Sequence, residues 1–431
     1  MTVLKQGQSA DIGLLLEGTY PYVSGGVSSW VNQIIKGFPE YTFALCFIGS
    51  QPSDYGDMRY ALPDNVVHLE VHYLHEPQSK PPVIKRKGNA QVFKEIRCLH
   101  DQYRHADSPK TEMASLLASI MKHRNEGRYA EADFLYSRES WDYITEQYRE
   151  RCTDPSFVDY FWTVRIMHSP LWKLMALTES FIPVKVFHTI STGYAGFLGA
   201  LMKQRTGKPL ILSEHGIYTK ERKIDLFQAE WIRDNRGTLA KDSSEVAYFR
   251  HLWIRFFEAL GRDCYHHADR IIALYETNRL RQIQDGAPAE RTENIPNGIN
   301  FPHLAKVREQ RSDTIPLTIC LIGRVVPIKD IKTFIRAMRT VVNQLPTAEA
   351  WIAGPEDEDP DYAADCRSLV QGLGLSDHVK FLGFQRIDEL LPKVGLLVLS
   401  SISEALPLVI LEGYAAGVPC VSTDVGSCRQ L

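Results

Sequence analysis

The chain has 431 residues, of which 44% are hydrophobic and 23% are charged, and its formal net charge is −3. This composition is ordinary for a soluble globular protein, and the length favours two domains over one. No basic stripe with interleaved aromatic residues occurs, so the charge pattern gives no reason to expect a nucleic-acid partner.

The sequence also lacks the usual signals for export or membrane insertion. No apolar run reaches the ~18 residues that span a bilayer, and the N-terminus has no signal-peptide apolar region. We therefore expect a cytoplasmic protein. The eight cysteines are scattered without a CxxC pair, which favours reduced thiols over a disulfide framework or a zinc site.

The N-terminal part alternates between apolar strands and an amphipathic helix. The pattern predicts a strand over 11–17, a Gly-rich turn over 18–26 and a helix over 27–37. Two further strands are predicted over 41–48 and 66–71. This order is typical of the start of a doubly wound parallel sheet.

From about 76 to 182 the apolar residues recur at helical spacing without strand-like alternation. We interpret this segment as a helical insertion in the first domain and as a candidate surface for a partner or an acceptor. Strands then resume over 184–188, 210–213 and 270–274.

The segment Asn294 to Ile299, with its Pro and Asn-Gly, is typical of a domain boundary. We therefore predict an N-terminal Rossmann-like domain over 1–298 and a C-terminal one over 299–431. The second domain has predicted strands over 317–322, 348–353, 379–382, 396–400 and 418–422. A domain of this type usually carries more helix after its last strand, so we expect a chain truncated at its C-terminus.

Two carboxylates, Glu404 and Glu412, follow the predicted strand over 396–400. A carboxylate just beyond the carboxyl end of a parallel strand faces the crevice where open α/β sheets bind ligands. Glu412 lies beside the apolar run 406–411, where an unpaired charge is costly. This arrangement suits a nucleotide-sugar site, with one acid near the sugar and one near the ribose. The alternative is a solvated first helical turn in which Glu404 complements the dipole.

A second motif places cations after the first strand of the C-terminal domain. Gly323 and Arg324 follow that strand, and Lys329 opens the next helix. Arg binds a phosphate through two nitrogens, Lys adds a compact charge, and a helix N-terminus adds free N–H groups. These residues predict a diphosphate site. The alternative is a pair of surface charges, one of them paired with Asp330.

Five further loop residues complete the candidate site. Gly25 and Gly26 let the backbone approach a ligand closely, but their motif is not GxGxxG, which argues against a nicotinamide enzyme. His215 could place an imidazole at the reacting carbon of a sugar, although a lone histidine is more often structural. Asn297 at the boundary and Gly354 after a strand are the other candidates.

We expect no metal site. Asp357-Glu-Asp359 resembles the acid-x-acid metal motif of other sugar transferases, but we interpret it as a solvated loop because Arg324 and Lys329 already meet the phosphate charge. The pair His266-His267 lacks a third ligand nearby.

Taken in their order along the chain, these motifs resemble those of family-4 retaining glycosyltransferases of the GT-B type, in which two Rossmann-like domains face a cleft. The matching pieces cover nearly the whole chain. The segment 17–30, the helical insertion and the segment 214–222 are more closely similar to the soluble glycosyltransferases of bacterial Pel exopolysaccharide systems.

The resemblance implies a UDP-sugar donor, either UDP-glucose or UDP-N-acetylhexosamine, with no cofactor and no metal, and transfer with retention of configuration. Arg324 and Lys329 would hold the diphosphate, Glu412 the ribose and Glu404 the donor sugar. His215 would lie beside the anomeric carbon. Gly25 and Gly26 would line the diphosphate and acceptor side.

The implied partners are a glycan acceptor and an inner-membrane polysaccharide synthase complex, which would hold the cytoplasmic chain at the membrane. A different class of function is a non-catalytic subunit that binds a nucleotide sugar and regulates a membrane synthase. A third is a sugar phosphorylase of similar fold, against which the lack of a pyridoxal-binding lysine motif counts.

Overall fold

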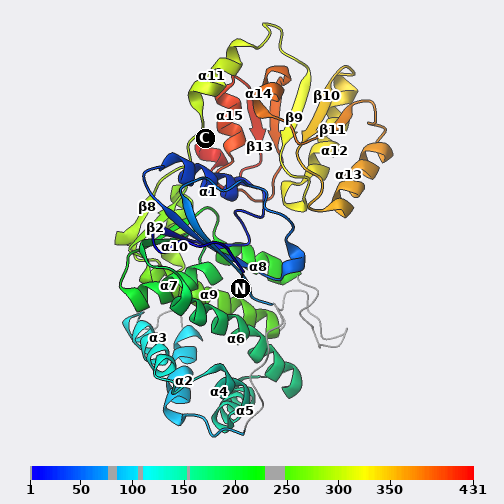
Figure 1. Cartoon of the computed structure of the whole chain (residues 1–431). Coiled ribbons are helices and arrows are strands. Elements are labelled where there is room, and N and C mark those ends of the chain that lie inside the picture. Colours follow the sequence, from blue (N-terminus) through cyan, green and yellow to red (C-terminus); the bar gives the residue numbers. More distant parts are fainter. Residues whose placement is uncertain (1, 76–84, 105–109, 153–155, 229–247) are drawn as a thin grey trace. The chain divides into compact units, whose positions relative to one another are not determined.

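The computed structural model describes residues 2–75, 85–104, 110–152, 156–228 and 248–431. The chain forms two compact units (Figure 1). Unit 1 contains residues 1–273 and 279–293, and unit 2 contains 274–278 and 294–431.

Unit 1 is built on an eight-stranded sheet with the order β1-β4-β3-β2-β5-β6-β7-β8. Its strands are β1 Thr2–Lys5, β2 Ala10–Glu17, β3 Phe43–Gly49, β4 Val66–Tyr73, β5 Val184–Thr189, β6 Leu210–Glu214, β7 Arg270–Ala273 and β8 Thr292–Asn294. The pairs from β4 through β7 are parallel, whereas β1 pairs antiparallel with β4 at the edge. The strand order reverses between β2 and β5, which makes this the switch point of the sheet.

The apolar runs explain these strands. All seven residues of β3 are buried, as expected where helices cover both faces of a parallel sheet. The predicted strands over 11–17, 41–48 and 66–71 are confirmed. The antiparallel β1 and the three-residue β8 were not predicted, because short edge strands carry little apolar pattern.

The connection from β4 to β5 is helical over its described part. Its helices are α2 Ala90–Arg104, α3 Lys110–Asn125, α4 Glu131–Tyr136, α5 Arg138–Arg151 and α6 Phe157–Ser180. Ser137 and Ser156 cap α5 and α6 with their hydroxyl groups, which explains where these two helices begin. The predicted helical segment also includes residues 76–84, 105–109 and 153–155, which lie outside the described residues.

These helices share one core with the sheet. The other helices of unit 1 are α1 Gly26–Gly37, α7 Tyr194–Thr206, α8 Tyr218–Gln228 and α9 Tyr248–His267, together with most of α10 Glu276–Gln284, whose first three residues belong to unit 2. Helix α7 packs on β2 and β5, α6 and α9 pack on α7, and α2 and α3 pack on α9 (Figure 1). A continuous hydrophobic cluster runs from Leu15 in the sheet to Tyr143 in α5.

Unit 2 has a five-stranded sheet, parallel throughout, with the order β11-β10-β9-β12-β13. Its strands are β9 Thr318–Ile322, β10 Glu349–Ala353, β11 Val379–Gly383, β12 Leu396–Leu399 and β13 Cys420–Ser422. Its helices are α11 Phe301–Glu309, α12 Ile331–Gln344, α13 Pro360–Gly372, α14 Ile387–Leu390 and α15 Leu408–Ala415. All five predicted strands are confirmed, and the switch point lies between β9 and β12.

Two further observations concern the whole chain. Within the described residues, no helix combines the length and the apolar character needed to cross a bilayer. All eight cysteines are free, as the sequence predicts, and Cys46 and Cys320 are fully buried in strands. Cys420 is only half-buried, because β13 is the edge strand of its sheet.

Candidate functional site

Lys329 and Glu404 meet at the switch point of unit 2. The segment after β9 carries Lys329, and the segment after the neighbouring strand β12 carries Glu404. The Lys329 ammonium group donates a hydrogen bond to Glu404 Oε1, and Ser401 Oγ donates to the same oxygen at 2.6 Å. The two charged side chains are only 19% and 13% exposed. The structure therefore brings together two of the predicted site residues where an open sheet binds its ligand.

Hydrogen bonds hold the loops of this edge in place. Ser400 Oγ donates to the carbonyl oxygens of Lys329 and Asp330 at 3.0 Å each. The Ile402 N–H donates to the Ile328 carbonyl at 2.8 Å. Thr423 Oγ1, after β13, donates to the Ser401 carbonyl at 2.6 Å. The backbone around Lys329 and Glu404 is thus fixed before any ligand arrives.

Asp330 has a structural role. It adopts a left-handed backbone conformation with φ 45°, and its carboxylate caps α12 by accepting from the Thr333 N–H at 3.3 Å. Its carboxylate has no ion pair with Lys329 or Arg324 in the described part of the chain, so the alternative of a surface pair through Asp330 is wrong.

Arg324 points toward the acidic loop that follows β10. Its Nη1 donates to both carboxylate oxygens of Glu358. The pair is exposed, at 41% for Arg324 and 49% for Glu358, and exposed ion pairs of this kind contribute little stability. A phosphate could therefore replace Glu358 at low cost, although Arg324 does not contact Lys329 or Glu404 here.

The acidic loop is more ordered than a merely solvated loop. Besides the Glu358 contact with Arg324, Asp359 caps α13 by accepting from the Tyr362 N–H at 3.0 Å, and Glu356 pairs with Arg367 at 2.8 Å. The part of the chain that the structure describes holds no group of three or more potential metal ligands.

Glu412 is placed on α15, as predicted, and is half-buried. Its carboxylate has no hydrogen bond or ion pair with any described residue. Burial raises the pKa of this carboxyl group. A half-buried acid without a protein partner is available to a ligand that offers hydroxyl groups.

Gly354 has a packing role that needs no ligand. A Cβ atom there would lie 1.9 Å from the carbonyl oxygen of Gly323, so only glycine fits between β9 and β10. Gly323 is held by a hydrogen bond from its N–H to the Ala353 carbonyl at 2.9 Å. A Cβ atom at Gly323 would lie at van der Waals distance from the aliphatic part of Lys329. This glycine is therefore beside the Lys329 side chain.

Three residues at this edge were not predicted from the sequence: Ser401, Thr423 and Gly426. Gly426 has φ 58°, and a Cβ atom there would lie 2.3 Å from the Glu404 carbonyl oxygen. Only a glycine therefore allows the backbone to approach Glu404 this closely. The run of hydroxyl residues after β12 and the threonine after β13 are the signals that could have indicated Ser401 and Thr423.

In unit 1, Gly25 and Gly26 lie at the N-terminus of α1. A Cβ atom at either position would meet nothing within 4 Å, so the space in front of both is open. No side chain caps this helix, and its first turn carries no acid. The exposed N–H groups suit an anionic or hydroxyl ligand.

His215 directly follows β6 and is 8% exposed. Its ring stands edge-on to Trp30 at 4.6 Å, and its Nε2 has no hydrogen-bond partner in the described structure. Burial lowers the pKa of His215 to about 4, so the imidazole is neutral at pH 7. A neutral, unpartnered ring nitrogen can hydrogen-bond a sugar hydroxyl.

The neighbouring Glu214 anchors this turn. It is buried and accepts hydrogen bonds from Tyr265 Oη at 2.7 Å, Tyr218 N at 3.0 Å and Gln282 Nε2 at 3.1 Å. Burial raises the pKa of Glu214, although its hydrogen bonds oppose the rise.

Glu17, the last residue of β2, is a further residue that sequence reasoning missed. It accepts from Tyr218 Oη at 2.7 Å and from the Ala195 N–H at 3.1 Å, and Arg222 lies 3.7 Å away. Asn297 is half-buried in the segment between β8 and α11, and its side chain makes no hydrogen bond with the described residues.

The two doubly wound sheets, each with a switch point, define a two-domain α/β protein of the GT-B type. HepE of Anabaena, solved with UDP and glucose, superposes with a TM-score of 0.52 at 17% identity, covering 98% of this chain and 82% of that one. Sucrose-phosphate synthase of Thermosynechococcus elongatus gives a TM-score of 0.52 at 14% identity, covering 97% and 83%. At these identities the likeness shows the fold alone.

The chain belongs to the family described as "Domain of unknown function (DUF3492)", whose model matches residues 10–290, more than half of the chain. Residues 305–431 match the family "Glycosyl transferases group 1". The candidate residues Gly323, Arg324, Lys329, Glu404 and Glu412 all lie in this second match.

Curated relatives cover smaller parts. An exopolysaccharide phosphotransferase of Streptomyces coelicolor is 34% identical over 160 residues, 36% of this chain and 16% of that protein. A D-inositol 3-phosphate glycosyltransferase of Streptomyces griseus is 24% identical over 254 residues, 54% of this chain and 51% of that protein. The chain thus spans at most about half the length of these two relatives.

Proposed function

We propose that this protein is a UDP-sugar-dependent hexosyltransferase that works without a metal and retains the configuration of the transferred sugar. The observation that carries the proposal is the contact between Lys329 and Glu404 at the switch point of a group 1 glycosyl transferases domain. One charge of this pair suits a phosphate and the other suits sugar hydroxyls.

The proposed donor site uses each charged residue for one part of the molecule. Lys329 binds the diphosphate, and Arg324 joins it by exchanging Glu358 for phosphate. Glu404, freed from Lys329 when the phosphate arrives, accepts hydrogen bonds from the donor sugar. Glu412 takes the ribose hydroxyls, for which its unpartnered carboxylate is available. For His215 we keep the role at the anomeric carbon that the resemblance implies.

In the proposed reaction, the acceptor hydroxyl oxygen forms a bond to the anomeric carbon while the bond from that carbon to the donor phosphate oxygen breaks. The departing phosphate oxygen takes the proton of the hydroxyl group, and the products are UDP and the extended glycan. Lys329 and Arg324 stabilise the charge that builds up on the leaving phosphate. No other base and no metal are needed to balance this step.

We propose UDP-glucose or UDP-N-acetylhexosamine as the donor and a growing exopolysaccharide as the acceptor. The complex of HepE with UDP and glucose and the name of the Streptomyces coelicolor relative support these choices. The segment 17–30 further supports a PelF-like role in the cytoplasm, beside an inner-membrane polysaccharide synthase complex.

A non-catalytic subunit that binds the nucleotide sugar and regulates a synthase is the alternative. It requires binding without turnover, whereas the proposed enzyme must release UDP. The presence of His215 together with Arg324, Lys329 and Glu404 favours the enzyme, because a subunit that only binds the donor does not need an imidazole at the reacting carbon.

The test is UDP release from UDP-glucose and UDP-N-acetylglucosamine in the presence of hexose and N-acetylhexosamine oligosaccharides. We expect release that depends on acceptor and falls at least ~30-fold in Glu404→Gln, and an α-linked product by proton NMR. Donor binding by calorimetry without UDP release would identify the regulatory subunit instead.

A further inference from the structure

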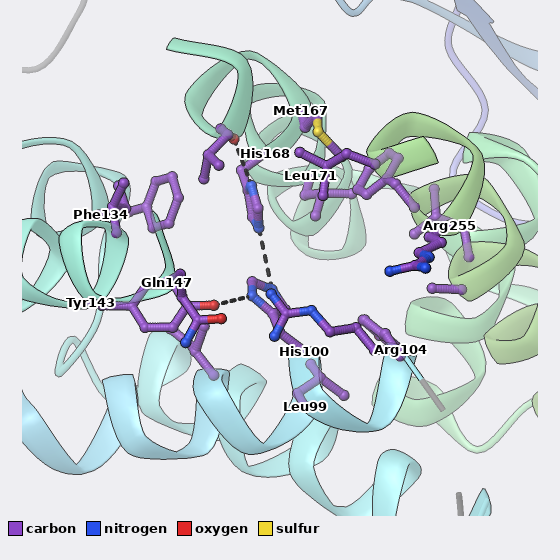
Figure 2. A pocket seen from close by; sticks show the side chains of 18 of the residues that line it. Leu99, His100, Arg104, Phe134, Tyr143, Gln147, Met167, His168, Leu171 and Arg255 are labelled. Carbon is purple, nitrogen blue, oxygen red and sulfur yellow. Dashed lines mark hydrogen bonds between the residues drawn. The ribbon is translucent and has the colours of Figure 1, made fainter. Parts of the chain in front are cut away.

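A cavity of about 610 Å³ lies within the helical part of unit 1 (Figure 2). Its walls come from α2, α4, α5, α6 and α9, together with parts of α3 and α7. The cavity contains none of the candidate site residues described above. Its volume falls in the range of about 300 to 1,000 Å³ that is typical of small-molecule sites.

The interior of the cavity is mainly apolar and aromatic. Leu99, Phe134, Met167 and Leu171 line it (Figure 2), together with Trp172 and other large side chains. Flexible methionine and leucine side chains adapt to an aliphatic chain, and the aromatic rings add large contact areas.

His100 and His168 in the wall belong to one chain of hydrogen bonds. Tyr143 Oη bonds to His100 Nδ1 at 2.5 Å, and His100 Nε2 to His168 Nε2 at 3.2 Å. His168 Nδ1 then bonds to the Val164 carbonyl at 2.7 Å, as Figure 2 shows by dashed lines. Burial lowers the pKa of both histidines, so this chain of hydrogen bonds carries no charge at neutral pH.

Gln147 is the polar group in the wall that lacks partners. It is 2% exposed, and neither its Oε1 nor its Nε2 has a hydrogen-bond partner in the described structure. It lies one helical turn after Tyr143 on α5, so it shares the face that lines the cavity (Figure 2). A buried carboxamide without partners is unfavourable, and a ligand with a polar group beside its chain would satisfy it.

The charged residues of the cavity all have the same sign. Arg104, Arg151 and Arg255 line it, and no Asp or Glu is among the described lining residues. Arg104 and Arg151 share the carboxylate of Asp101. Arg255 on α9 is exposed and forms no ion pair with any described residue, so its guanidinium group is free to bind an anion at the opening.

We propose that this cavity binds an anionic amphiphile with a single aliphatic chain and a carboxylate or phosphate head. The chain lies among the apolar walls, the head contacts Arg255, and a polar group near the head pairs with Gln147. The cavity shares no residue with the candidate donor site, and binding there does not require glycosyltransferase activity.

Three probes of equal chain length distinguish the parts of the proposal. Palmitate and hexadecyl phosphate carry the two kinds of anionic head, and methyl palmitate carries none. Calorimetric titration of the purified chain, below the micelle concentration of each probe, should show saturable binding of one or both anions at one site. Methyl palmitate should bind at least ~10-fold more weakly. Failure of both anions to bind, or equal binding of methyl palmitate, would overturn the proposal.

Two exposed arginines provide a matched pair of variants. Arg255→Gln removes the free cation at the cavity and should weaken binding of the anion about 5-fold. Arg138→Gln, on the exposed face of α5 and outside the cavity, should leave binding unchanged. Neither change buries an unpaired group, so both variants should fold. Equal affinities of the two variants would show that the charge of Arg255 does not hold the head.

Discussion

Glu412 has a half-buried carboxylate with a raised pKa and no partner among the described residues. Its charge is therefore unfavourable for the fold, and the carboxylate is available to a ligand. In Glu412→Gln we expect the free energy of unfolding at pH 7 to stay equal or to rise. The affinity for UDP should fall about 10-fold, because the ribose hydroxyls lose a charged acceptor.

Denaturant unfolding and calorimetry with UDP measure the two effects. Glu309→Gln, an exposed acid on α11 of the same unit, is the control and should change neither. A Glu412→Gln protein with unchanged UDP affinity would remove this residue from the ribose role.

His215 gives a prediction about pH. Its pKa is about 4 in the folded protein and about 6.5 in the unfolded chain, because burial disfavours the charged ring. As the pH falls from 6.5 to 4, the unfolded chain takes up this proton first, so the contribution of His215 to stability falls by about 3 kcal/mol. In His215→Gln this loss should be absent.

The comparison must be made against wild type, because buried acids act in the opposite direction. Burial raises the pKa of Asp263 to about 7, so its contribution falls as the pH rises instead. The measured quantity is the difference in unfolding free energy between His215→Gln and wild type. As the pH falls from 6.5 to 4, the variant should become more stable relative to wild type. A constant difference would contradict the neutral state of His215.

At the residue level, the sequence predicted the meeting of Lys329 and Glu404. Both follow strands, and parallel strands present their carboxyl ends at one edge. The pairing of Arg324 with Glu358 was not predictable, because it depends on how the loop after β10 turns back. The hydrogen-bond partners of Glu17 were not predictable either, because Tyr218 and Ala195 are distant from it in sequence.

At the level of elements, the close approach of the chain segments after β9 and β10 predicts that a methyl group at Gly354 destabilises the fold. A Cβ atom at Gly354 would overlap the Gly323 carbonyl oxygen at 1.9 Å. We expect Gly354→Ala to lower the free energy of unfolding by about 2 kcal/mol or more. Because Gly323 adjoins Lys329, UDP binding should weaken as well.

Gly372, the last residue of α13, is the matched control because a Cβ atom there would meet nothing within 4 Å. Gly372→Ala should be neutral or stabilise by about 0.5 kcal/mol. Denaturant unfolding of both variants provides the measurement. Equal stabilities would show that the two strands can move apart at Gly354 without cost.

Elements were predictable where their apolar pattern is strong. Apolar residues fill most of the centre of the run 11–17 and most of the run 317–322, and the strands β2 and β9 occur there. Helices α8 and α10 were missed because charged and polar residues dominate them. Their formation depends on packing against neighbouring elements, such as α9 in the case of α8.

At the level of the whole molecule, two series of alternating strands and helices predicted two parallel sheets, and the structure contains both. The cavity in the helical part was not predictable. Helical periodicity indicates which residues face inward, but a volume of about 610 Å³ depends on the distances between five or more helices.

Metal independence is a prediction about the whole reaction. If Lys329 and Arg324 meet the charge of the leaving diphosphate, a chelator should leave the rate of UDP release unchanged. EDTA at a concentration well above that of contaminating metals tests this. Loss of activity with EDTA and recovery with manganese would indicate that the acidic loop, with Asp357 and Asp359, holds a metal.

We expect the edge formed by β9 and β12 to bind the diphosphate of a nucleotide sugar. Calorimetric titration with UDP of wild type, Lys329→Met and Lys332→Met tests it most directly. Lys332, the second residue of α12 and paired with Asp365, is the control of equal charge. We predict one site, an affinity reduced about 30-fold in Lys329→Met and unchanged in Lys332→Met; equal UDP affinities in all three proteins would contradict the claim.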